Sequence, residues 1–207
     1  TTTEEEMSLA TFKRKLFLTL KKDEFKTLYP EKEAFFEAFS ADKQNEIVVN
    51  EKDCIFGAYP TLTQINQIYG KEAAQEWVAL QLVKLMEFLN YENNLNANQI
   101  IELSYHIYMR FQWLKVSELM LFLWLYKEEE FGDHYGRIEP AVIFRALRDF
   151  VGEDGYRSKK IREIMQSIEE KYYELHDQHV DNSRDFLDEV QGVLASKFTN
   201  SSEIKEE

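Results

Sequence analysis

Apolar residues recur at intervals of three and four along most of the chain, which is the spacing that places side chains on one face of an α-helix. Ser8 can cap the first such helix, and the Tyr29–Pro30 step should end it, because the residue before a proline avoids the helical conformation. A second helix is predicted from Pro30 to about Ser40. The two stripes are Leu9, Phe12, Leu16 and Leu20, and then Phe35, Phe36 and Phe39.

Residues 41–58 break this pattern. Polar residues precede the β-branched triplet Ile47-Val48-Val49, and a charged patch then leads to Cys54. Such a triplet is typical of a short strand or of an extended linker, and two short strands alone could not form a sheet. We expect no helix here, and we treat the segment as the boundary between an N-terminal appendage and the main domain.

Helix termini are signalled clearly between residues 59 and 150. The signals are capping-box pairs, a glycine suited to a helix end and an acid–proline pair suited to a helix start. They fall at Thr61 with Gln64, Asn96 with Gln99, Gly70, and Glu139 with Pro140. Residues 71–89 carry one apolar stripe, whereas residues 119–126 are apolar on every side and should form the central helix of the core.

The helical spacing continues over residues 156–198. An unbroken helix of that length would measure about 65 Å, against a radius of gyration of about 17 Å for a compact chain of this size, so we expect a break at residues 181–183. The sequence predicts an all-α fold, an antiparallel helical bundle with a long C-terminal helix or helix pair. We expect a disordered N-terminus (1–7), a helical appendage and linker (8–58), a core bundle (59–150), long C-terminal helices (151–199) and a disordered tail (200–207).

Composition narrows the class of protein. The formal net charge of −13 disfavours, without excluding, binding to nucleic acid. The single cysteine cannot form an internal disulfide, no apolar run is long enough to cross a membrane, and the acidic start lacks a secretory pattern. We therefore expect a cytoplasmic protein without membrane contact, whose partner is another protein or a second copy of the chain.

One polar turn could perform chemistry, because it places a histidine near two carboxylates, as proton transfer requires. The candidates are Lys127, Asp133, His134, Tyr135, Arg137 and Glu139. The alternative, which we favour, is a tight connector in which Gly132 and Gly136 make the turn while Phe131 and Tyr135 pin two core helices.

Positive charge gathers in two segments that could contact phosphates if they shared one face. The candidates are Lys13, Arg14, Lys15, Lys21, Lys22, Arg145, Arg148, Arg157, Lys159 and Lys160. Residues 61–80 also have the outline of a helix-turn-helix. Its second helix offers mainly acidic and apolar residues rather than base-reading ones, so we interpret it as a structural hairpin.

Motifs for nucleophile elbows, phosphate loops and dinucleotide binding are absent from the sequence. His176 and His179 stand three apart but lack the further ligands that a metal site needs. We expect neither a cofactor nor a metal, and we expect that the protein is not an enzyme.

The segment from Tyr59 to Phe150 resembles a family of small helical proteins with a domain of unknown function, found in bacterial prophage-like and conjugative-element neighbourhoods. The resemblance rests on the residues Tyr59-Pro60-Thr61-Leu62, Ile65, Tyr69-Gly70, Leu114 to Met120, Lys127, Phe131-Gly132, Tyr135-Gly136, Glu139-Pro140, Ile143, Ala146-Leu147 and Phe150. It implies an accessory role in a mobile genetic element and transfers no catalytic residue.

Three hypotheses follow. The first is a non-enzymatic interaction protein that binds a protein partner or itself through apolar helix faces. The alternative is a nucleic-acid-associated accessory factor that uses the basic segments. The third, an enzyme, requires Asp133, His134 and Tyr135 to line one pocket.

Overall fold

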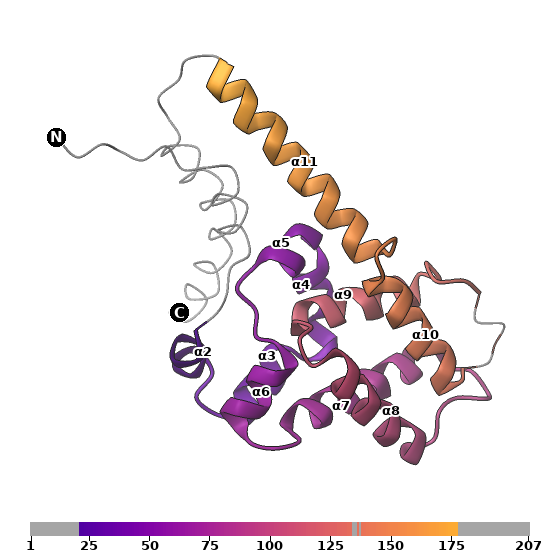
Figure 1. Cartoon of the computed structure of the whole chain (residues 1–207). Helices are drawn as coiled ribbons and strands as arrows, with labels where there is room; N and C mark the ends of the chain where they lie inside the picture. The colour runs from indigo at the N-terminus through magenta and orange to yellow at the C-terminus, as the bar shows by residue number, and fades with distance from the viewer. Residues whose placement is uncertain (1–20, 134–135, 137, 178–207) are drawn as a thin grey trace, which may run out of the picture. The chain divides into compact units, whose positions relative to one another are not determined.

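The computed structural model describes residues 21–133, 136 and 138–177, and within them it is all-α. Packing divides the chain into two units, Leu18–Lys160 and a second one formed by Thr1–Phe17 with Ile161–Glu207. The helices, labelled in Figure 1, are α2 (Lys22–Leu28), α3 (Lys32–Ala38), η1 (Ala41–Lys43), α4 (Gln44–Val48), α5 (Glu51–Phe56), α6 (Leu62–Tyr69), α7 (Ala73–Leu89), α8 (Ala97–Phe111), α9 (Val116–Lys127), α10 (Pro140–Val151) and α11 (Tyr156–Asp177). The described residues contain no strand, only an isolated bridge between Thr61 and Lys115.

The capping signals are confirmed. Both expected capping boxes form, at the start of α6 and at the start of α8. Gly70 ends α6 with a φ of 103°, a conformation that favours glycine, and Pro140 opens α10. These signals act within three or four residues of the backbone groups that they satisfy, so the sequence alone reveals them.

The expectation of a strand or linker over residues 41–58 is wrong, because this segment forms η1, α4 and α5. Val48 is buried in α4, which packs against α9, and the Gln44 side chain donates to the backbone oxygen of Met120 at 2.6 Å. Asn50 caps α5 by accepting a hydrogen bond from the Asp53 backbone. Packing against α9 therefore overrides the strand preference of the β-branched triplet.

The expected boundary at residue 58 does not separate two packing units. Phe25, Phe35 and Phe39 belong to the same buried cluster as Trp77, and the rings of Phe35 and Trp77 lie 6.2 Å apart. The indole of Trp77 donates to the backbone oxygen of Phe39 at 2.9 Å, and the amide of Gln81 donates to the same oxygen at 2.8 Å. Residues 22–58 are thus part of the core rather than an appendage to it.

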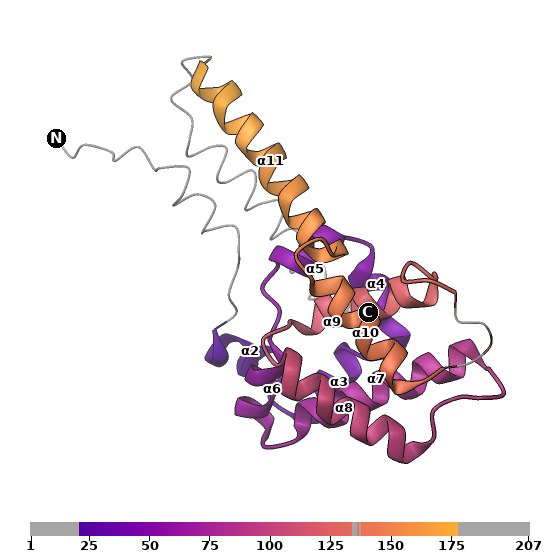
Figure 2. The same ribbon diagram turned by 45° about the vertical axis from the view of Figure 1, so that its right-hand side comes forward.

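The expected central helix is confirmed as α9. Every residue from Val116 to Tyr126 is buried except Trp124, which is partly exposed. Its neighbours are α4, α5, α7 and α10, so helices from both ends of the unit Leu18–Lys160 surround it (Figures 1 and 2). A helix that is apolar on all sides can remain stable only in such surroundings.

Other expectations lie partly or wholly outside the described residues. These are the helix with the stripe from Leu9 to Leu20, the break at 181–183 and both expected disordered ends. α11 does form over Tyr156–Asp177. No helix among the described residues has the length and apolar content needed to cross a membrane. The antiparallel order of the bundle stays a prediction.

Replacing Phe122 by alanine tests the central position of α9. Phe122 is fully buried, whereas Phe88 on α7 is 61% exposed and serves as the matched control. We expect Phe122→Ala to lower the free energy of unfolding by about 3–5 kcal/mol, because a cavity replaces the ring, and Phe88→Ala to lower it by less than about 1 kcal/mol. Chemical denaturation measures both. Equal losses would contradict the central role of α9.

Alkaline stability provides a second test of the core. Burial raises the pKa of Tyr69 to about 12, and its hydroxyl donates to the backbone oxygen of Tyr29 at 2.6 Å. Between pH 10, the ordinary pKa, and about 12, the folded chain keeps this proton while the unfolded chain loses it. The stabilisation is therefore complete below pH 10 and disappears as the pH rises towards 12.

We accordingly expect Tyr69→Phe to flatten the fall in the free energy of unfolding between about pH 10 and 12. The measurement is denaturant unfolding at a series of pH values. The control is Tyr105→Phe, which removes the hydroxyl of a tyrosine that is 53% exposed. If the free energy of unfolding of Tyr69→Phe falls with pH as steeply as that of the wild type, the Tyr69 hydroxyl does not cause this fall.

Candidate functional site

The polar turn is only partly described. His134, Tyr135 and Arg137 lie outside the described residues, and Asp133 is exposed. The Lys127 ammonium donates to the side-chain oxygen of Gln44 and lies 5.1 Å from the ring centre of Phe88. Burial lowers the pKa of Lys127. Lys127 thus connects α9 to α4 and α7.

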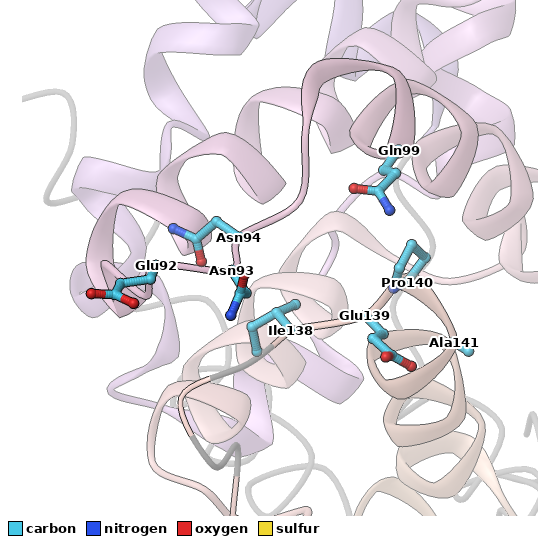
Figure 3. A pocket seen from close by; sticks show the side chains of 8 residues that line it. All are labelled: Glu92, Asn93, Asn94, Gln99, Ile138, Glu139, Pro140 and Ala141. Carbon is cyan, nitrogen blue, oxygen red and sulfur yellow. The ribbon is translucent and has the colours of Figure 1, made fainter.

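Glu139 lines an open pocket of about 670 Å³ between the α7–α8 connection and the start of α10. Figure 3 shows Glu92 and Glu139 at opposite ends of this pocket, with Asn93 and Ile138 between them. Two of the amide side chains that line the pocket also stabilise the fold. Gln99 completes the α8 capping box, and Asn94 donates to the backbone oxygen of Met86. Neither Asp133 nor Lys127 lines the pocket.

Three of the described cations of the basic segments lie close to carboxylates. Arg157 pairs with Glu118 at 2.7 Å, and Lys160 pairs with Glu51 at 2.8 Å. Lys21 lies 3.8 Å from Glu24. Arg145, Arg148, Lys159 and Lys22 are exposed, while Lys13, Arg14 and Lys15 lie outside the described residues. Two of the expected phosphate contacts are therefore already neutralised by carboxylates.

The helix-turn-helix outline corresponds to α6 and α7, and its polar residues bond within the fold. Asn66 donates to Gln75 at 3.1 Å and accepts from the Ala74 backbone at 2.7 Å, which fixes the turn. Glu76 binds Lys32 at 2.8 Å. These contacts occupy side chains that a recognition helix would need for base edges.

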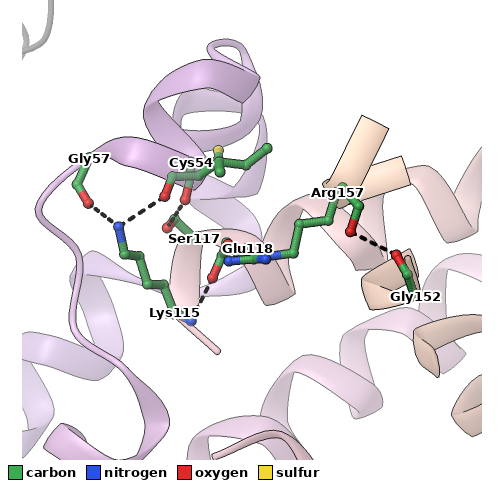
Figure 4. Close-up of polar contacts among 9 residues, drawn as sticks. Cys54, Gly57, Lys115, Ser117, Glu118, Gly152 and Arg157 are labelled. Carbon is green, nitrogen blue, oxygen red and sulfur yellow. Dashed lines mark hydrogen bonds and ion pairs between the residues drawn. The ribbon is translucent and has the colours of Figure 1, made fainter. Parts of the chain in front are cut away.

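A buried polar cluster that the sequence analysis missed joins α5, α9 and α11 (Figure 4). The carboxylate of Glu118 is 1% exposed and accepts from the Lys115 backbone at 3.0 Å and from the Arg157 guanidinium at 2.7 Å. That guanidinium lies 5.2 Å from the ring centre of Trp113. A carboxylate buried this deeply is stable only because both partners are present.

Lys115 completes the cluster. Its ammonium donates to the backbone oxygens of Ile55 at 2.9 Å and Gly57 at 2.7 Å, at the end of α5, where helical carbonyls lack partners. Burial lowers the pKa of Lys115. The Ser117 hydroxyl donates to the backbone oxygen of Cys54 at 2.7 Å. All these groups bind one another or the backbone, as is typical of a structural network.

The described residues hold no group of three or more side chains suited to bind a metal ion. The side chains of His176 and His179 lie outside the described residues. A small apolar hollow of about 160 Å³ lies between α3, η1 and α7, with Leu80 and Val83 at its edge. It is too small for most ligands, whose pockets measure about 300 Å³ or more.

The outer face of α8 carries exposed apolar side chains. Its inner face packs into the core through Ile100, Leu103, Ile107 and Phe111. Ile101, Tyr105 and Met109 lie on successive turns of the outer side and are 62%, 53% and 53% exposed. We call these three residues the α8 apolar row. Both views show α8 at the edge of the unit Leu18–Lys160, beside α7 (Figures 1 and 2).

The chain matches no protein-family model, no curated protein sequence and no solved structure.

The Glu118–Arg157 pair is tested by a double-mutant cycle. Arg157→Leu leaves a buried carboxylate without its cation, so we expect a loss of about 3 kcal/mol in the free energy of unfolding. Adding Glu118→Gln to this variant removes the buried charge but keeps an acceptor for the Lys115 backbone. We therefore expect the free energy of unfolding of the double variant to be about 1 kcal/mol or more above that of Arg157→Leu alone. Arg148→Leu, at an exposed arginine, is the control. Additive losses in a denaturation series would contradict the pairing.

Proposed function

We propose that this chain is a non-enzymatic helical interaction protein, an accessory of a mobile genetic element, which binds a protein partner or itself through the α8 apolar row. The observation that carries the proposal is the exposure of Ile101, Tyr105 and Met109 on three successive turns of one helix. Burial of apolar area contributes about 25 cal/mol per Å². Three adjacent side chains therefore provide a continuous surface that gains free energy when a partner covers it.

The shape of the row also suits a protein. A ridge of side chains at i, i+4 and i+8 packs well into the grooves of another helix, whereas a small molecule needs a concave site. Two of the row's three side chains, Tyr105 and Met109, are of the types found most often at surfaces that bind proteins. Aromatic residues and methionine are enriched at protein interfaces.

The accessory role in a mobile genetic element rests on the resemblance carried by residues 59–150. Its residues mostly serve the fold: Thr61 caps α6, Glu118 anchors Arg157, and Ile143 and Phe150 are buried. A scaffold of this kind leaves function to its surface residues, in keeping with an interaction protein. The nucleic-acid alternative receives no comparable support, because Arg157 and Lys160 are paired with carboxylates.

Photo-cross-linking in the host cell tests the proposal. The full chain would carry p-benzoylphenylalanine at Tyr105, with the same residue at Asp149, an exposed position on α10, as the control. We expect an adduct with a protein from the first position and none from the second, because only the first lies on the proposed interface. Mass spectrometry identifies the adduct, which is either another protein or a second copy. The absence of any adduct from Tyr105, or equal adducts from both positions, would refute the proposal.

A further inference from the structure

Next to the α8 apolar row runs a second row, also on successive turns and also exposed. It consists of Glu102, His106 and Arg110, each one residue after a member of the apolar row. We call it the α8 charged row. It places an acid near the start of the helix, a histidine at its middle and a base near its end.

Neither Glu102 nor Arg110 forms an ion pair within the described part of the chain, unlike the pairs Glu118–Arg157 and Glu51–Lys160. The ring of His106 lies 6.1 Å from the neighbouring ring of Tyr105, measured between the ring centres. An apolar row is thus bordered by two opposite charges, eight residues apart, that are available to an incoming partner.

Each of the two rows matches the same row of a second copy whose α8 runs in the opposite direction. If a second α8 lies antiparallel across the first, with a two-fold axis near Tyr105 and His106, Ile101 faces Met109 of the second copy. In the same register, Glu102 of the first copy approaches Arg110 of the second copy. Arg110 of the first copy likewise approaches Glu102 of the second copy, on the same edge of the pair. A two-fold interface requires such matching, because each surface must be the complement of itself. In a parallel two-fold arrangement the charged rows of the two copies would lie on opposite edges of the pair, so Glu102 could not meet Arg110.

We propose that the α8 apolar and charged rows bind the same rows of a second copy, in an antiparallel two-fold pair centred on Tyr105 and His106. This inference rests on the proposed function and names the partner. The positions of the charges are the reason to choose a second copy. Glu102 and Arg110 lie four residues before and after His106, beside the middle of the apolar row, and binding to an unrelated partner would not require this symmetry.

The area that two α8 helices can bury limits how tightly two copies of the chain bind. A helix of 15 residues is about 22 Å long, so one helix pair buries less than the roughly 1,600 Å² of a standard stable interface. The pair should therefore be a reversible dimer with a dissociation constant in roughly the micromolar range.

Sedimentation velocity on the full chain, at about 1–300 μM to span that range, tests the inference. Glu102→Arg and Arg110→Glu would each place like charges together twice per dimer, so each should raise the dissociation constant about tenfold or more. The double variant restores opposite charges in the same register and should return close to the wild-type value. An equimolar mixture of the two single variants should associate as well, because each supplies the charges that the other needs.

Controls separate folding from association. All the altered residues are exposed, so circular dichroism and thermal unfolding should stay at wild-type values. Arg148→Glu, a charge reversal at an exposed arginine on α10, should leave the dissociation constant unchanged.

Three outcomes would overturn the inference. They are a wild-type chain that stays monomeric throughout, a dimer that none of the variants weakens, and a double variant as weak as the single ones. If the chain is monomeric but Tyr105 cross-links to a different protein in the cell, the proposed function stands and only the self-association fails. If no adduct and no dimer form, both fail.

Discussion

The complete burial of α9 is the constraint on which the rest of the structure depends. A helix that is apolar on every side has to be enclosed, and α4, α5, α7 and α10 enclose it. Its first turn must also be satisfied away from water. Glu118 meets this need by accepting from the Lys115 backbone, and its charge is then balanced by Arg157. The first turn of α11 is therefore fixed by the same carboxylate that begins the central helix.

The range of each interaction explains which features of the fold the sequence predicts. The capping boxes at Thr61 and Asn96 involve partners three residues apart, so they can be recognised directly. The helix over residues 44–48 depends on contacts with α9, such as that of Gln44 with Met120, 76 residues away. Local preference favours a strand for Ile47-Val48-Val49, and only the distant contact reverses it. Contacts of that range leave no pattern in a single sequence.

The same limit applies to the candidate site. Arg157 and Lys160 look like members of a basic cluster, but the acids that hold them stand 39 residues before the first and 109 before the second. Lys127 looks like part of a polar turn, but it binds Gln44. The i, i+4 rows of α8 could have been found in the sequence. Their exposure could not, because residues 100–111 are apolar at inner and outer positions alike.

The two faces of α8 give the interaction hypothesis its physical basis. Ile100, Leu103, Ile107 and Phe111 already dock the helix on the core, so the fold does not require apolar residues on the other side. Polar residues at 101, 105 and 109 would keep the helix and lower the risk of aggregation. The charged side chains of Glu102 and Arg110 beside them lack an ion-pair partner among the described residues. Apolar side chains and unpaired charges thus occur together on the same helix face. The interaction that we propose would cover these apolar side chains and pair these charges in one step.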